Sequence, residues 1–122
     1  MKNQKDEIII RTAVASDLNE IVELTEKEFR SASIDAKIED MIGGTPWIQT
    51  KALVLKAELE KNPDGCFVAL MDGELVGYIT TAVVSIASRG VIANIAVSAK
   101  LQGMGIGRKL IDRALGFFKD IG

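Results

Sequence analysis

A glycine-rich turn, Gln102-Gly-Met-Gly-Ile-Gly-Arg108, lies between two apolar segments of different periodicity. The segment before it, residues 91–97 (VIANIAV), is typical of a strand, and a helical pattern begins after it near Ile106. Glycines let a backbone approach a ligand closely, and the first-turn N–H groups of a helix lack internal partners and lie at the positive end of its dipole. The turn therefore predicts an anion site where a helix begins.

Three consecutive strands are expected before this turn. The apolar run at residues 66–71 is followed by Asp72-Gly73, a strong signal for a two-residue hairpin. A run rich in Val, Ile and Thr occupies residues 75–86, and residues 87–90 (ASRG) indicate a second turn into the strand at 91–97. The pattern predicts an antiparallel meander.

The first half of the chain predicts one strand and two helices. Residues 8–12 form the strand, Ser16 is the expected N-cap of a helix over residues 17–30, and residues 31–46 are expected to be a loop. We expect a mixed α/β protein of the α+β class, in the order β-α-α-β-β-β-α, with a mainly antiparallel central sheet flanked by helices. The apolar positions of the second helix are Ile48, Ala52, Leu55 and Leu59, residues 62–65 (NPDG) end it, and Gly122 is the expected C-cap of the last helix.

Length and composition exclude several classes of protein. With 122 residues the chain is expected to form one domain, residues 1–122, with residues 1–7 flexible. The net charge of −2 gives no indication of nucleic acid or membrane partners, and no apolar run reaches membrane-spanning length. The single cysteine, Cys66, excludes an internal disulfide and fits a reducing cytoplasm. Because the chain has no histidine, we expect no metal site.

Two other phosphate-binding motifs fit the turn poorly. A P-loop needs a hydroxyl side chain after its lysine, whereas Arg108-Lys109-Leu110 follows the last glycine. A dinucleotide fingerprint has different glycine spacing and directly follows its strand. A purely structural turn stays open, but Lys100, Arg108 and Lys109 favour a polyanion, since each positive charge in a first helical turn costs about 0.3–1 kcal/mol.

The stretch of residues 94–111 (NIAVSAKLQGMGIGRKLI) resembles the acetyl-CoA-binding motif of the GNAT superfamily of N-acetyltransferases. That family's pattern, Gln/Arg-x-x-Gly-x-Gly/Ala, is matched by Gln102, Gly105 and Gly107. The weaker likeness of the meander and of residues 9–17 extends the resemblance over residues 8–121, with Ala99 where many members have proline.

The resemblance implies an acetyl-CoA cosubstrate and direct attack by a primary amine in a ternary complex. The acceptor would be a small molecule, a peptide N-terminus or a lysine. Backbone groups of Ile95, Ala96 and Val97 would bind the pantetheine arm. The pyrophosphate would lie in the turn, on the amides of Gln102, Gly103, Met104, Gly105, Ile106, Gly107 and Arg108.

The sequence identifies no catalytic residue. Some members of the family carry a glutamate on the strand matching residues 89–97, and this chain has no carboxylate there. Tyr78 and Asn94 are candidates for ordering a water, with a core position as the alternative for Tyr78. Carboxylates that would attract a cationic acceptor, or simply form a solvated face, are Glu28, Asp35, Glu39 and Asp40.

The family's usual fold continues beyond the last helix, so the strand at 91–97 is expected to be an apolar sheet edge that a C-terminal segment or a second copy of the chain would cover. Two other functions remain open. One is a module that binds CoA, or regulates through it, without catalysis. The other is a scaffold whose edge strand pairs with a partner.

Overall fold

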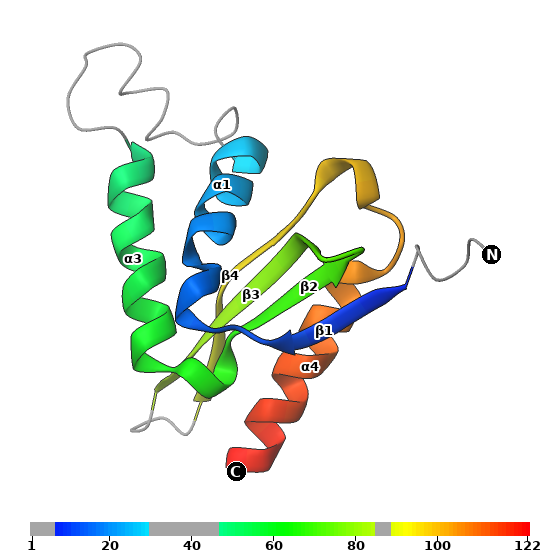
Figure 1. Cartoon of the computed structure of the whole chain (residues 1–122). Coiled ribbons are helices and arrows are strands. Elements are labelled where there is room, and N and C mark those ends of the chain that lie inside the picture. The colour runs from blue at the N-terminus through cyan, green and yellow to red at the C-terminus, as the bar shows by residue number, and fades with distance from the viewer. Residues whose placement is uncertain (1–6, 30–46, 85–88) are drawn as a thin grey trace.

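The computed structural model describes residues 7–29, 47–84 and 89–122 (Figure 1). The expected loop at 31–46, with Asp35, Glu39 and Asp40, lies outside the described residues. Residues 1–6, which belong to the segment expected to be flexible, also lie outside the described residues, as do residues 85–88, where the predicted strand ends and the predicted second turn begins.

One four-stranded antiparallel sheet forms the centre of the fold. Its strands are β1 (Ile8–Thr12), β2 (Phe67–Met71), β3 (Glu74–Val84) and β4 (Arg89–Val97), in the spatial order β1-β2-β3-β4. The predicted meander is confirmed. Asp72 and Gly73 join β2 to β3 with φ values of 55° and 78°, as a type I′ hairpin turn requires.

Helices cover both faces of the sheet (Figure 1). The pair α1 (Leu18–Phe29) and α3 (Trp47–Lys61) packs on one face, and α4 (Ile106–Ile121) packs on the other. The element order is the predicted one, and Gly122, with a φ of 85°, caps α4 by donating its N–H to the Lys119 carbonyl. Short 3₁₀ helices lie at Ala15–Asp17, Pro63–Gly65 and Ala99–Leu101.

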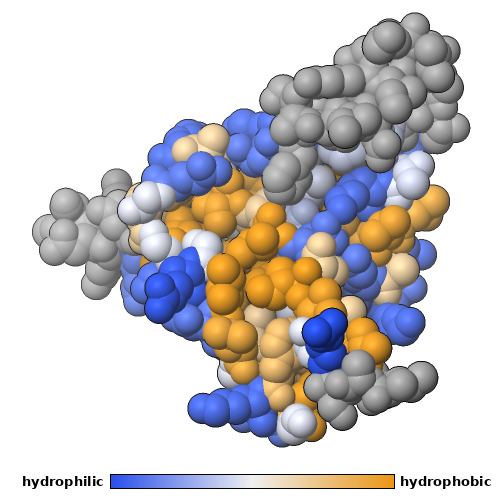
Figure 2. Space-filling view, turned by 180° about the vertical axis from the view of Figure 1, so that it is seen from behind, coloured by the Kyte–Doolittle hydropathy of each residue, from blue (hydrophilic) through white to orange (hydrophobic). Residues whose placement is uncertain are grey.

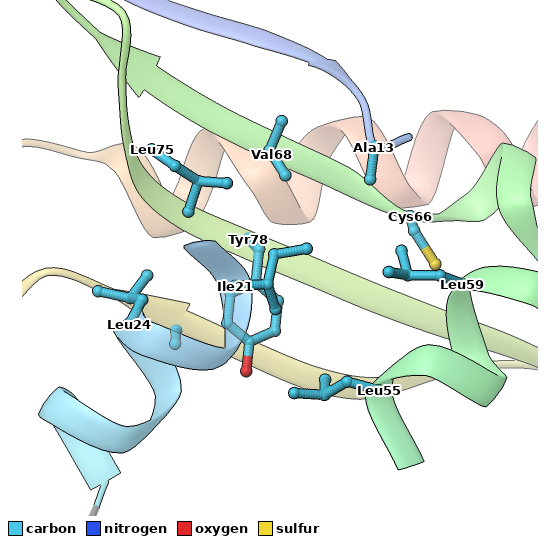
Figure 3. Packing of buried hydrophobic residues seen from close by; sticks show 10 residues of the cluster. Ala13, Ile21, Leu24, Leu55, Leu59, Cys66, Val68, Leu75 and Tyr78 are labelled. Atoms are coloured by element: carbon cyan, nitrogen blue, oxygen red, sulfur yellow. The ribbon is translucent and has the colours of Figure 1, made fainter. Parts of the chain in front are cut away.

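Two apolar clusters, one on each face, stabilise these layers. On the α4 face, Ile106, Leu110 and Ala114 recur at helical spacing and are at most 1% exposed. On the opposite face Tyr78 is fully buried between strands and helices (Figure 3). The other members of that second cluster are Ala13, Ile21, Leu24, Leu55, Leu59, Cys66, Val68, Leu75 and Ala96.

The predicted N-cap at Ser16 is wrong, because Ser16 is an exposed residue inside the 3₁₀ turn. The N-cap of this turn is Val14, and the carboxylate of Asp17, at the third position of the turn, accepts the Val14 N–H at 2.8 Å. The same carboxylate receives two hydrogen bonds from the Arg11 guanidinium, at 2.8 and 2.9 Å. These bonds hold the pKa of the buried Asp17 below its ordinary value, with the Arg11 hydrogen bond as the largest cause.

Two residues of the predicted second turn, Arg89 and Gly90, belong to β4 instead. Gly90 pairs with Val83 and lies under the ring of Phe118 on α4, so a Cβ at Gly90 would overlap that ring. The glycine at this position therefore serves close packing of α4 on the strand rather than a turn.

The strand β4 is an edge of the sheet, as expected for the described strands. Its apolar side chains Val91 and Ile92 are 38% and 37% exposed. The face turned away in Figure 1 carries a contiguous apolar area in its middle (Figure 2). Among the described helices, none is long and apolar enough to cross a membrane.

Candidate functional site

A cavity of about 530 Å³ lies between the C-terminal end of β4 and the N-terminal end of α4. It is lined by Glu28 of α1, Leu101 and nine of the ten residues expected to bind the cofactor. Met104 is the exception, and its side chain is 47% exposed. The lining residues from the expected set are Ile95, Ala96, Val97, Gln102, Gly103, Gly105, Ile106, Gly107 and Arg108.

Two glycines shape the turn that borders this cavity. Gly103 and Gly105 have φ values of 95° and 82°, in the left-handed region that side-chain-bearing residues avoid. A Cβ at either glycine would meet no atom within 4 Å, so the space beside both is open. Gly105 is also the N-cap of α4, and the first intrahelical bond runs from the Lys109 N–H to its carbonyl. Helix geometry therefore leaves the amides of Ile106, Gly107 and Arg108 for a ligand. The Gln102 and Met104 N–H groups donate to the Ala99 and Leu101 carbonyls in this structure.

The edge of β4 supplies a second set of backbone groups. The Ser98 N–H donates to the Val76 carbonyl at 2.8 Å, so Ser98 faces β3. Because neighbouring residues in an antiparallel ladder alternate, Ala96 also faces β3, while the N–H and C=O groups of Ile95 and Val97 point outward. The Gln102 side-chain amide donates to the outward Val97 carbonyl at 3.3 Å.

The charges around the turn are mixed. The Glu28 carboxylate accepts the Ala99 N–H at 3.1 Å and places a negative charge at the cavity wall. Arg108 forms an exposed i,i+4 pair with Asp112 at 3.4 Å, a weak interaction that leaves the guanidinium open to water. A polyanion in the cavity would thus gain mainly from backbone amides and would meet one carboxylate.

A polar network that the sequence analysis missed joins α3 to the sheet. The Glu58 carboxylate oxygen Oε1 accepts hydrogen bonds from Thr80 Oγ1 and from Asn94 Nδ2, each at 2.7 Å. On the other side of the same amide, Lys51 Nζ donates to Asn94 Oδ1 at 2.5 Å. The strand β4 has no carboxylate of its own, and α3 brings one to it.

A sequence signal for this network did exist. Lys51 and Glu58 stand about one helical turn on either side of Leu55, whose side chain is fully buried. Polar residues at that spacing share the face that packs on the sheet. Only the fold shows that Asn94 is the residue they meet, because that partner is 36 to 43 residues away.

Of the two roles expected for Tyr78, ordering a water or packing in the core, the structure shows the core position. Tyr78 is 0% exposed, and its hydroxyl shares a 2.7 Å hydrogen bond with Thr25 Oγ1 of α1. Figure 3 shows the ring among the apolar side chains of this face. Burial raises the pKa of the Tyr78 phenol, and the nearby Glu58 carboxylate adds to the shift. Within the described ranges, no group of three His, Cys, Asp or Glu side chains could hold a metal ion.

Comparison with known proteins supplies a family and a fold. The model of the acetyltransferase (GNAT) family matches residues 18–122. No curated protein matches the chain.

Solved structures share the fold. A GNAT-family acetyltransferase from Brucella melitensis, solved with acetyl-CoA, is 27% identical at a TM-score of 0.67, and the match covers 95% of this chain and 71% of that one. The PaiA N-acetyltransferase of Thermoplasma acidophilum, solved with coenzyme A, is 21% identical at a TM-score of 0.72, with 95% and 74% covered. A Pyrococcus horikoshii protein is 22% identical at 0.72, but the chain spans only 35% of its length.

Proposed function

The chain belongs to the acetyltransferase (GNAT) family, and from that premise we propose that it binds acetyl-CoA in the cavity beside β4 and transfers the acetyl group to a primary amine. One observation carries the proposal. The outward backbone groups of Ile95 and Val97 and the first-turn amides of α4 line the same cavity. A strand edge suits an amide-bearing arm, and a helix N-terminus suits a pyrophosphate.

The residues present fit this ligand. The open space at Gly103 and Gly105 lets phosphate oxygens approach the backbone, and the α4 dipole favours their charge. The pantetheine arm would add to the edge of β4 by bonding Val97 and Ile95, and the Gln102 amide would release the Val97 carbonyl to admit it. The acetyl-CoA complex of the 27% identical Brucella protein supports this choice of cosubstrate.

This orientation sets where the acetyl group would lie. An arm that starts at the turn and runs along β4 reaches Ile95 and then the segment Ala93-Asn94. There the register with β3 shifts, because Thr80 pairs with Asn94 and Thr81 with Ile92. Such a bulge disrupts the ladder locally and bends the strand. We place the reaction at this point, beside the Asn94 side chain, with a small-molecule amine, a peptide N-terminus or a lysine as acceptor.

Binding and transfer are tested separately. Titration of the ¹⁵N-labelled chain with acetyl-CoA should shift the amides between Ile95 and Arg108, and unchanged amides there would refute the proposed site. Thiol release from acetyl-CoA in the presence of a panel of primary amines then measures transfer.

The second candidate is a CoA-binding module without catalysis. One observation favours it: Tyr78, a candidate for ordering a water at the reaction point, is buried and hydrogen bonded to Thr25 and so does not reach a substrate. Amine-dependent thiol release would exclude this reading. Shifted amides with no release from any amine of the panel would favour it.

A further inference from the structure

We propose that Lys51 is an acetyl acceptor of this chain, so that the protein acetylates its own α3 helix at Nζ. This inference rests on the proposed function, because it takes the acetyl group from acetyl-CoA bound along β4. It adds a modification site at a defined atom.

The first argument is the position of the amine. Lys51 Nζ lies 2.5 Å from Asn94 Oδ1, on the strand residue next to Ile95. The outward groups of Ile95 line the cavity, and the bulge of β4 begins at the following pair. An arm that reaches Ile95 would therefore deliver its thioester within one residue of the place where the Lys51 amine is held.

The second argument is that a neutral amide, rather than a carboxylate, binds the Lys51 amine. Within the described residues Nζ has a neutral amide as its partner and no carboxylate within ion-pair distance. The side chain is half-buried, which limits the positions open to the amine. By contrast, Lys56 on the same helix is 58% exposed and lies 3.8 Å from Glu60.

The third argument is a nearby proton acceptor. The side-chain amide of Asn94 accepts from Lys51 Nζ through its oxygen and donates to Glu58 Oε1 through its nitrogen. A single amide group therefore separates the carboxylate from the amine. Within the described residues, Glu58 Oε1 accepts the two hydrogen bonds of this network and no donor bonds Oε2.

Tethering can offset the ordinary inertness of a lysine. An amine with the reference pKa of about 10.4 is neutral in only about one molecule in 2,500 at pH 7. A well-oriented intramolecular nucleophile reaches effective molarities of about 10⁵–10⁸ M. Orientation at the reaction point is therefore the main advantage that the fold gives the Lys51 amine.

The reaction balances without any further reagent. The Lys51 ammonium gives one proton to solvent by way of Glu58. Nζ then bonds to the acetyl carbonyl carbon, and the C–S bond breaks with its electron pair on sulfur. The second proton leaves Nζ and protonates the thiolate. The products are acetyl-lysine, the CoA thiol and one released proton.

The test uses the full chain with acetyl-CoA alone. Intact mass should rise by one acetyl group, and peptide mapping should place it on Lys51 at a rate about tenfold or more above that at Lys56, as expected for an oriented amine. The rate should saturate with acetyl-CoA, and the rate per molecule should not depend on protein concentration. Lys51→Arg should abolish the modification, the matched control Lys56→Arg should leave it, and Asn94→Ala should slow it although acetyl-CoA still shifts the amides of the turn.

The outcomes separate the two proposals. Shifted amides with Lys51 no faster than Lys56 would overturn the inference and leave the cofactor site intact. A rate per molecule that rises with protein concentration would also overturn it, since transfer would then be between copies. Absence of amide shifts would remove the proposed function and this inference together.

Discussion

The side-chain amide of Asn94 on β4 donates a 2.7 Å hydrogen bond to the carboxylate of Glu58 on α3, 36 residues earlier in the chain. Glu58 also accepts from Thr80, whose side chain is 1% exposed. The two bonds tie α3 to the edge of the sheet beside the proposed reaction point. Changes at Glu58 are therefore expected to alter the stability of the fold according to the hydrogen bonds that they remove.

Glu58→Ala should lower the free energy of unfolding by about 1–3 kcal/mol, because it leaves the buried Thr80 hydroxyl without its acceptor. Glu58→Gln keeps an oxygen acceptor in the same place and should cost less than about 1 kcal/mol. Urea denaturation of the two variants measures the difference. Equal losses in both would show that the charge, and not the hydrogen bonds, stabilises this contact.

Gly105→Val should abolish acetyl-CoA binding. A branched side chain strains the backbone at a φ of 82° and enters the open space where the pyrophosphate would lie. The matched control is Gly116→Ala on α4, where a Cβ meets nothing within 4 Å and φ is not positive. That control should keep binding and gain about 0.5–1 kcal/mol of stability from helix propensity. Calorimetric titration and thermal unfolding check both, and normal binding by Gly105→Val contradicts the assignment.

Glu28→Gln should tighten acetyl-CoA binding by about two- to fivefold at low salt, as expected for one partly exposed charge. The variant removes a negative charge from the wall of the polyanion site, while its amide oxygen can still accept the Ala99 N–H. The gain should shrink as salt screens the interaction. Glu26→Gln, at an exposed position of the same helix, is the control and should leave the Kd unchanged.

Asp17→Asn should lower stability at neutral pH by about 1–3 kcal/mol and flatten its dependence on acid. The folded state holds the pKa of Asp17 below the unfolded value of about 3.9, so this contribution is present above that value and is lost as pH falls through the lower folded pKa. Wild type should therefore lose stability below about pH 4 more steeply than the variant. Ser16→Ala, which would cost about 1 kcal/mol if Ser16 were the cap, should have almost no effect.

Tyr78→Phe should lower the stability at pH 7 by about 1 kcal/mol, because the buried hydrogen bond between Tyr78 and Thr25 is lost while Thr25 keeps its bond to the Ile21 carbonyl. The variant should leave amine acetylation unchanged. Burial raises the pKa of Tyr78 in the folded state, so its contribution is present below the unfolded value of about 10 and is lost as pH rises above it. Since Tyr78 is the only tyrosine, phenolate absorbance reports its titration directly. Strongly reduced acetyl transfer in the variant would reveal a catalytic role that burial argues against.

Local patterns were enough for much of this protein. The periods of the apolar residues predicted every described α-helix and strand, but not the short 3₁₀ helices, because burying one face imposes a repeat only on a segment of several residues. Asp72-Gly73 and the residues from Gln102 to Arg108 were recognisable because positive φ values at a tight turn favour particular residues. The family resemblance rests on the same short stretch, and the match over residues 18–122 confirms it.

Contacts between distant segments were decided only by the tertiary structure. Asn94, Glu58 and Lys51 meet because α3 packs on the face of β4 that carries Asn94, and nothing local to any of them encodes that pairing. Ser16 has a side chain typical of an N-cap, but the turn begins after Val14, and the Asp17 carboxylate, bound by the Arg11 guanidinium, accepts the Val14 N–H. The sequence alone thus determined which α-helices and strands form, and it predicted where an anion would bind. The fold determined which side chains share a site, since packing sets distances that chain order does not.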